Sequence, residues 1–187
     1  MKSEPTDERL VELSVGNQAF FAVLVSRYED KFLRYIKRRT RVSDKDAEDI
    51  LQNIFIKIYL NLNGFDPSLK FSSWGYRIAH NEIVSEHRKR LARPQHELAD
   101  GDEDIFQNMA SDMNIERDLI ARDSRNELRN AVEKLSEKYK DIILLRFFEE
   151  QDYESISDIL QMPPGTVATR LNRAKKELKA LLEQQHD

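Results

Sequence analysis

Hydrophobic residues in this chain recur every three or four positions, which is the spacing of a helix with one buried face. A first apolar stripe contains Phe20, Phe21, Leu24, Val25, Tyr28, Phe32, Tyr35 and Ile36. A second contains Ala47, Ile50, Leu51, Ile54, Phe55, Ile58 and Leu62. Ser43 precedes the second stripe and can cap its helix. Turn-forming residues at 63–67 separate it from a third long helix, predicted from Phe71 to about Arg90.

The pattern changes after Pro94. Residues 94–114 are acidic and weakly periodic, which predicts an extended or disordered linker. Helical spacing resumes near Ile115, and its apolar positions are Leu119, Leu128, Ala131, Val132 and Leu135. A further helix is predicted from Ser136 to about Glu149. The predicted fold class is therefore all-α, with two small helical domains at about 8–93 and 115–183.

Residues 152–179 have the pattern of a helix-turn-helix. A short helix carrying Ile156, Ile159 and Leu160 stops at residues 161–165, where Pro164 suits the first turn of a new helix. The apolar stripe of the second helix consists of Val167, Leu171, Ala174, Leu178 and Leu181. Its opposite face carries Thr169, Asn172, Arg173, Lys176 and Lys179.

The second helix of such a motif lies in the major groove of DNA. Thr169, Asn172 and Arg173 are then candidates for base edges, whereas Lys176 and Lys179 lie nearer phosphates. The alternative is a helical hairpin whose lysines are simply solvated.

Composition narrows the possible functions. The net charge is −4, but it divides into +4 over residues 1–94, −6 over 95–126 and −2 over 127–187. Such a chain should bind free duplex weakly unless a partner adds affinity. The sequence has no cysteine, which excludes disulfides and thiolate chemistry and agrees with a reducing cytoplasm. It shows no apolar run of about 18 residues and no signal peptide, so we expect no membrane insertion.

The segment from residue 61 to 90 mixes aromatic and basic side chains. Phe71, Trp74 and Tyr76 stand among Lys70, Arg77, His80, Asn81, Arg88 and Lys89. Aromatic rings beside cations suit single-stranded nucleic acid, because bases stack on the rings. The alternative is that Trp74 and Ile78 face a core. A basic run between Lys31 and Arg41 either follows a nucleic-acid backbone or is plain solvated surface.

Two sets of motifs together resemble the extracytoplasmic-function (group IV) sigma factors of bacteria. DAEDILQNIFIKIYLNL at 46–62 and FSSWGYRIAHNEIVSEHRKR at 71–90 resemble sigma region 2. AVEKLSEKYKDIILLRFFEEQDYESISDIL at 131–160 and PPGTVATRLNRAKKEL at 163–178 resemble region 4. The motifs occur in the family's order and cover nearly the whole chain except the linker and the tails. The resemblance implies a factor that binds core RNA polymerase and directs it to promoters, without covalent chemistry of its own.

The resemblance also implies roles for individual residues. Asp49, Gln52 and Asn53 correspond to the surface that docks on the β′ clamp helices, and the family's region 4 meets the β flap. Residues 63–73 correspond to the loop that captures a base flipped from the minus-ten element. The minus-ten candidates are Phe65, Lys70, Phe71, Ser72, Trp74, Arg77, Asn81, Arg88 and Lys89. The minus-35 candidates are Thr166, Ala168, Thr169, Arg170, Asn172, Arg173 and Lys176. The acidic linker corresponds to a tether near the RNA path, and family members are usually controlled by an anti-sigma factor.

Four positions depart from the family pattern. Ala168 stands where many relatives carry Arg or Lys, and Asn172 lies at a variable position. Gln161 replaces a common turn glycine, so a differently built turn is possible. Gly75 occupies a usual leucine position and weakens the helix beside Trp74.

Three other functions remain as alternatives. A stand-alone regulator would bind duplex DNA without polymerase, but it leaves the Trp74 segment unexplained. A sigma-like adaptor would dock on polymerase without reading promoters. An enzyme is disfavoured, since no catalytic triad order or phosphate loop stands out. His80, His87 and Glu86 could hold a metal, but we predict neither metal nor cofactor.

Overall fold

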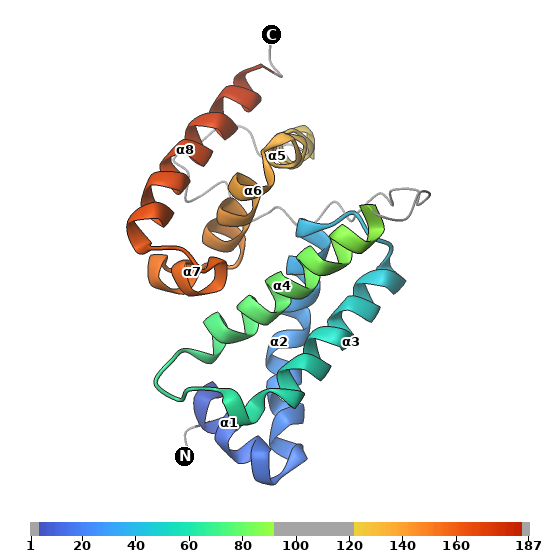
Figure 1. Cartoon of the computed structure of the whole chain (residues 1–187). Helices are drawn as coiled ribbons and strands as arrows, with labels where there is room; N and C mark the ends of the chain where they lie inside the picture. The colour runs from blue at the N-terminus through green and yellow to red at the C-terminus, as the bar shows by residue number, and fades with distance from the viewer. Residues whose placement is uncertain (1–3, 92–121, 185–187) are drawn as a thin grey trace. The chain divides into compact units, whose positions relative to one another are not determined.

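The computed structural model in Figure 1 describes residues 4–91 and 122–184. The chain forms two compact units, and the boundary between their main segments lies near residue 100. Every regular element within these two ranges is helical, which confirms the predicted fold class. The predicted linker 94–114 and the helical spacing at Ile115 and Leu119 lie outside the described residues, so the predicted domain boundaries stay predictions.

The first unit contains four α-helices and one short 3₁₀ helix. They are α1 (Asp7–Gly16), α2 (Gln18–Arg39), α3 (Asp44–Leu60), η1 (Leu62–Gly64) and α4 (Phe71–Leu91). Ser43 caps α3 as predicted, because its hydroxyl oxygen accepts a hydrogen bond from the Asp46 amide at 3.2 Å. Helix α1 was not among the elements predicted from the hydrophobic pattern. It packs on α2 and α4, and thereby adds a fourth helix to the first unit.

Aromatic side chains fill the core of the first unit. Phe32 is fully buried, and its ring centroid lies 5.3 Å from that of Tyr28, 5.7 Å from Phe55 and 5.1 Å from Tyr76. The predicted α2 stripe is buried except for Phe20 and Val25, which are half-buried. Helix α4 passes through Gly75 without interruption. A Cβ atom there would lie 3.0 Å from the Phe32 ring, so glycine permits this close approach of α4 to α2.

The second unit carries the predicted helix-turn-helix. Its elements are α5 (Arg122–Lys134), α6 (Glu137–Ile143), the π-helical segment η3 (Leu144–Phe148), α7 (Tyr153–Leu160) and α8 (Pro164–Glu183). Val167, Leu171, Ala174 and Leu178 are buried as predicted, whereas Leu181 is half-buried. The helix predicted over 136–149 is correct in extent, but its second half has π geometry, which periodicity alone does not distinguish from α.

The turn between α7 and α8 has the geometry that a glycine favours. Gln161 adopts φ 52° and ψ 50°, the left-handed conformation. The Met162 amide donates to the Ser157 carbonyl at 3.1 Å, and the Ser157 hydroxyl donates to the Met162 carbonyl at 2.5 Å. This is a usual helix C-terminal motif. Gln161 therefore occupies a left-handed position that glycine adopts without strain, and its Cβ adds backbone strain there.

We expect Gln161→Gly to raise the free energy of unfolding by about 0.5–1 kcal/mol, because a left-handed backbone costs a residue with a Cβ roughly 1 kcal/mol. Urea unfolding of the full chain measures the change. Glu177→Gly, at an exposed interior position of α8, is the matched control and should lower stability by about 1 kcal/mol. Equal loss of stability in both variants would contradict the strain at residue 161.

Candidate nucleic-acid interfaces

A pocket of about 360 Å³ opens on the first unit between the end of α3, η1 and one face of α4. It is lined by Lys57, Asn61, Gly64, Trp74, Arg77, Ile78 and Asn81. The structure thus brings together three of the residues proposed for the minus-ten element, Trp74, Arg77 and Asn81. The residues predicted for this site did not include Lys57, Asn61 or Ile78.

Three aromatic rings form the wall behind this pocket. The Trp74 ring centroid lies 5.2 Å from that of Phe65 and 5.9 Å from that of Phe71. Phe71 is 1% exposed, Phe65 7% and Trp74 8%. The rings therefore pack against one another at tilted or edge-on angles, and only the pocket-facing part of Trp74 is open to a base. Trp74 is a core residue, as one alternative held, and it also lines the pocket.

An ion pair with Glu82 holds the Lys57 side chain at the edge of this pocket. The Lys57 ammonium on α3 donates to Oε2 of Glu82 on α4. The Glu82 side chain is only 4% exposed, whereas that of Lys57 is 50% exposed. A buried carboxylate needs such a partner, so Glu82 holds a half-exposed cation beside the pocket.

The loop before α4 is ordered by a local turn. The Asp66 carboxylate accepts a hydrogen bond from the Ser68 amide at 2.9 Å, and the Ser68 backbone and side chain lower the pKa of Asp66. The Leu69 amide donates to the Asp66 carbonyl at 3.0 Å. Lys70 is exposed next to this turn and Ser72 is half-buried in the first turn of α4. Both lie within residues 63–73, the segment predicted to capture a base.

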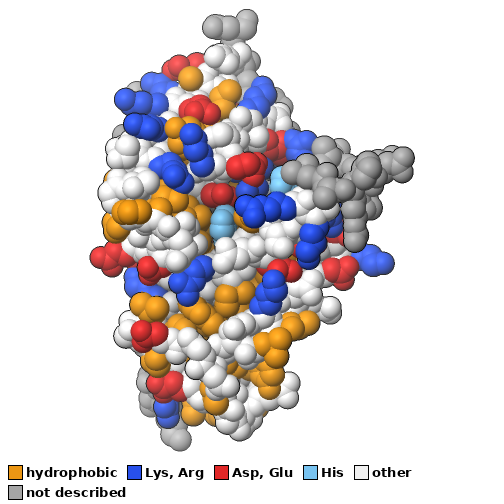
Figure 2. Space-filling view, in the orientation of Figure 1, with side chains coloured by type: hydrophobic (Ala, Val, Ile, Leu, Met, Phe, Trp, Pro, Cys, Tyr) orange, Lys and Arg blue, Asp and Glu red, His pale blue; other side chains and the backbone are white. Residues whose placement is uncertain are grey.

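Basic side chains on the first unit are not all available to DNA. Arg88 and Lys89 are exposed at the end of α4, and Lys89 bonds to Glu86. Within the 31–41 run, Arg39 is 4% exposed, so it belongs to the interior rather than to a backbone path. Figure 2 shows Lys and Arg side chains interspersed with carboxylates on the face in view. This distribution agrees with weak binding to free duplex.

The exposed face of α8 forms a second candidate interface. A pocket of about 290 Å³ there is lined by Lys138, Tyr139, Gly165, Thr166, Thr169, Arg170 and Arg173. Thr166, Thr169 and Arg173 are exposed, and Arg170 is half-buried. Lys138 and Tyr139, at the start of α6, were not selected from the sequence. Their contribution depends on the packing of α6 against α8.

The remaining α8 candidates lie outside that pocket. Asn172 and Lys176 are exposed, and Ala168 is half-buried. The Thr169 hydroxyl donates to the Gly165 carbonyl at 3.0 Å, which fixes its side chain against the helix. The face therefore presents amide, hydroxyl and cationic groups of the kinds that contact base edges and phosphates.

Two family models match this chain in the expected order. Sigma-70 region 2 matches residues 24–93, and Sigma-70, region 4, matches residues 125–178. The chain is 32% identical to the ECF RNA polymerase sigma factor SigW of Bacillus subtilis over 181 residues, covering 94% of this chain and 95% of SigW. It is 31% identical to the ECF RNA polymerase sigma-E factor of Escherichia coli K12, with 95% of both chains covered. The chain belongs to the ECF sigma factors.

Solved structures agree with this fold. CnrH, in a complex with the cytosolic domain of CnrY, matches with a TM-score of 0.70 at 23% identity, covering 96% of this chain and 99% of CnrH. RpoE of Bartonella quintana, in a complex with the anti-sigma factor NepR, matches with a TM-score of 0.65 at 19% identity. That match covers 87% of this chain and 96% of the RpoE chain. As an ECF sigma factor, the protein binds core RNA polymerase and promoter DNA and is not an enzyme.

The polymerase-docking candidates of this sigma factor lie on the exposed side of α3. Asp49, Gln52 and Asn53 are all exposed, and Gln52 lines a largely apolar groove of about 590 Å³ between α2 and α3. Helical spacing extends the same face to Ile56 and Leu60, which are 54% and 72% exposed. Exposed apolar side chains in a cluster often mark a protein interface. In the sequence, Ile56 and Leu60 can be recognised as apolar residues that lie outside the buried stripe of α3.

The alternative metal site has no support in the described part of this sigma factor. His80 Nδ1 lies 3.0 Å from the Tyr35 hydroxyl, so the ring is engaged in a hydrogen bond. Among residues 4–91 and 122–184, no three His, Asp or Glu side chains are grouped to hold an ion. Each described helix is too short or too polar to span a membrane.

Proposed function

We propose that this ECF sigma factor opens promoters by holding a minus-ten base in the α4 pocket while α8 reads the minus-35 element. The observation that carries the proposal is the grouping of Trp74, Arg77 and Asn81 around one opening of about 360 Å³. Extruding a base from a duplex costs a few kcal/mol. Contacts to the Trp74 edge and bonds from Arg77 and Asn81 offset that cost. Lys57 adds a cation on the side of η1.

The minus-35 role is assigned to the exposed face of α8. The α8 pocket lies at the N-terminal half of the helix, the end that a recognition helix directs toward bases. The α8 residues that line it include Thr166, Thr169, Arg170 and Arg173. Asn172 and Lys176 extend this surface along the helix. Ala168 supplies no hydrogen-bonding side chain, so we propose that it contacts DNA only through apolar packing.

Core RNA polymerase docks, in this proposal, on the exposed face of α3. Asp49, Gln52 and Asn53 supply polar contacts, and Ile56 and Leu60 supply apolar area that docking removes from water. Two weak DNA contacts on one polymerase-bound scaffold then act together. This accounts for promoter specificity in a chain whose net charge is −4.

We expect Asp49→Ala/Gln52→Ala to weaken binding to core RNA polymerase about tenfold or more, since the residues whose truncation costs over about 1 kcal/mol concentrate at the centre of an interface. Co-elution and fluorescence anisotropy with purified core enzyme measure the affinity. Asp30→Ala removes an exposed carboxylate from α2 and is the matched control, which should bind normally. Normal binding by the double variant would contradict the α3 site.

Control by an anti-sigma factor is the second part of the proposal. CnrH and RpoE, which share this fold, were solved in complexes, in the case of RpoE with an anti-sigma factor. We propose that a partner of this class covers one or both units and competes with polymerase or DNA. Because the relatives act with RNA polymerase, we propose that this chain works in the cytoplasm.

A further inference from the structure

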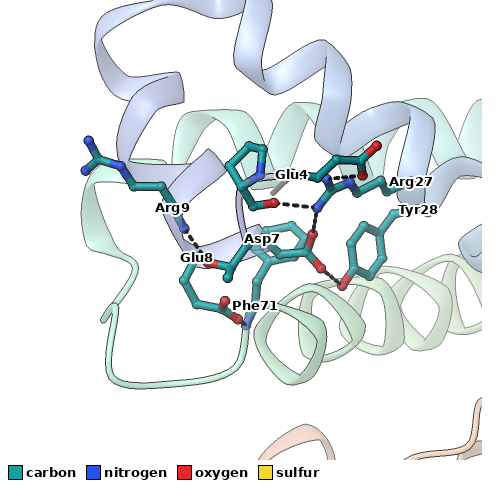
Figure 3. Close-up of polar contacts among 9 residues, drawn as sticks. Glu4, Asp7, Glu8, Arg9, Arg27, Tyr28 and Phe71 are labelled. Atoms are coloured by element: carbon teal, nitrogen blue, oxygen red, sulfur yellow. Dashed lines mark hydrogen bonds and ion pairs between the residues drawn. The ribbon is translucent and has the colours of Figure 1, made fainter. Parts of the chain in front are cut away.

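Helix α1 carries a polar cluster that none of the assigned roles explains. Figure 3 shows this N-terminal clasp, which we define as Asp7, Glu8, Arg27, Tyr28 and Phe71. Asp7 Oδ1 accepts a hydrogen bond from Arg27 at 2.6 Å, and its Oδ2 accepts one from the Tyr28 hydroxyl at 2.5 Å. One carboxylate therefore joins the start of α1 to two consecutive residues of α2.

Glu8 reaches from α1 to the first residue of α4. Its Oε1 accepts a hydrogen bond from the Phe71 amide at 3.0 Å. Amides in the first turn of a helix have no partner within that helix. The preceding residue, Lys70, has no side-chain acceptor that could cap the helix. The Phe71 amide donates its hydrogen bond instead to Glu8, which lies 63 positions earlier in the chain. The carboxylate also lies at the positive end of the α4 dipole.

Tyr28, another residue of the clasp, also contacts Phe71. The Tyr28 ring meets the Phe71 ring edge-on, with centroids 5.0 Å apart and an interplanar angle of 77°. Burial, and then the bond to Asp7, raises the pKa of Tyr28. A tyrosine hydroxyl is protonated at neutral pH in any case, so the raised pKa keeps Tyr28 donating to Asp7 at alkaline pH as well. The clasp thus holds Phe71 by its backbone through Glu8 and by its ring through Tyr28.

Phe71 in turn supports the minus-ten pocket. Its ring centroid lies 6.1 Å from that of Phe65 in the preceding loop and 5.9 Å from that of Trp74 in the pocket wall. Phe71 is 1% exposed, so it does not meet DNA in this conformation. It fixes where the loop ends and where α4 begins.

We propose that Glu8 is a positioning residue for minus-ten capture, which sets the start of α4, and with it the Phe65 and Trp74 rings, through the Phe71 amide. This inference rests on the proposed function of the α4 pocket. Glu8 touches no DNA. It holds the pocket in the geometry that receives a base before the promoter opens.

The test compares Glu8→Ala, Glu8→Gln and Glu12→Ala in the full-length chain assembled with core RNA polymerase. Glutamine keeps a side-chain oxygen that can accept the hydrogen bond from the Phe71 amide, whereas alanine has no such acceptor. Glu12 is an exposed carboxylate on the same helix that pairs with Arg9, so its removal changes charge without touching α4. Strand opening is measured by permanganate reactivity on a promoter mapped with the wild-type holoenzyme. Affinity for core polymerase and the melting temperature are measured in parallel.

We expect Glu8→Ala to reduce opening about five- to tenfold with core affinity unchanged within twofold. Glu8→Gln should restore opening to within twofold of wild type, and Glu12→Ala should match wild type. Normal opening by Glu8→Ala would overturn the inference. A parallel loss of opening, core binding and melting temperature that glutamine does not restore would overturn it too, because Glu8 would then be only structural. Failure of the wild-type holoenzyme to open any promoter would instead contradict the proposed function.

Discussion

Replacing Arg77 and Asn81 together with alanine should reduce promoter opening about 100-fold while core polymerase still binds. Both side chains line the α4 pocket. A well-placed base contact contributes about 1–3 kcal/mol. The loss of two such contacts, about 2–6 kcal/mol, spans the roughly 2.8 kcal/mol that corresponds to 100-fold. Asn81 is exposed and Arg77 half-buried, so their truncation leaves no cavity in the core. Permanganate reactivity of the minus-ten thymines at saturating holoenzyme measures the effect.

The matched control for this double variant is Arg9→Ala, which removes an exposed cation from the same unit away from the pocket. It should open promoters normally. Trp74→Ala is a less direct test, because truncating a buried tryptophan costs about 3–5 kcal/mol of stability. Opening within threefold of wild type by Arg77→Ala/Asn81→Ala would exclude this pocket as the base-capture site. A promoter that is already unpaired at the minus-ten element should bind less tightly to the double variant as well.

The helices themselves were largely predictable from the sequence, because burial of one face imposes a visible period. The α2 and α8 stripes, the Ser43 cap and the Pro164 helix start all follow from local chemistry. The hydrophobic pattern did not predict helix α1 or the π geometry of η3. A short helix shows few repeats of its period, and π geometry changes the hydrogen bonds more than the order of apolar residues.

The site was predictable only in part. Arg77 and Asn81, two of the predicted minus-ten residues, line one pocket, and their contact with DNA stays a prediction. An aromatic residue near cations can either stack with a base or fill a core. Phe65 and Phe71 prove to be core residues in this conformation, which depends on long-range packing. Lys57 was missed because its position is set by Glu82, a partner 25 residues away on another helix. Ile56 and Leu60 carried a usable signal, since both interrupt the polar side of α3.

Gly75→Leu, the residue that the family resemblance makes usual here, should destabilise this chain by about 1–2 kcal/mol. Even a Cβ at residue 75 would meet the tip of the Phe32 ring at 3.0 Å and the Phe71 ring at 3.7 Å. Phe32 is surrounded by the rings of Tyr28, Phe55 and Tyr76, so it has no room to withdraw. Overpacking a filled core commonly costs about 1–3 kcal/mol, which outweighs the gain of about 1 kcal/mol from replacing a helical glycine. Thermal and urea unfolding measure the loss.

A second substitution tests whether Phe32 is the cause. Phe32→Ala alone should cost about 3–5 kcal/mol by leaving a cavity. Combined with Gly75→Leu, it should cost less than the sum of the two, with a coupling of about 1–3 kcal/mol, because the leucine fills space that the ring vacates. Additive losses would mean that the two positions do not share this space. In this chain, a large ring on α2 and a glycine on α4 therefore share one volume, and the missing Cβ at Gly75 lets α4 pack closely on the Phe32 ring.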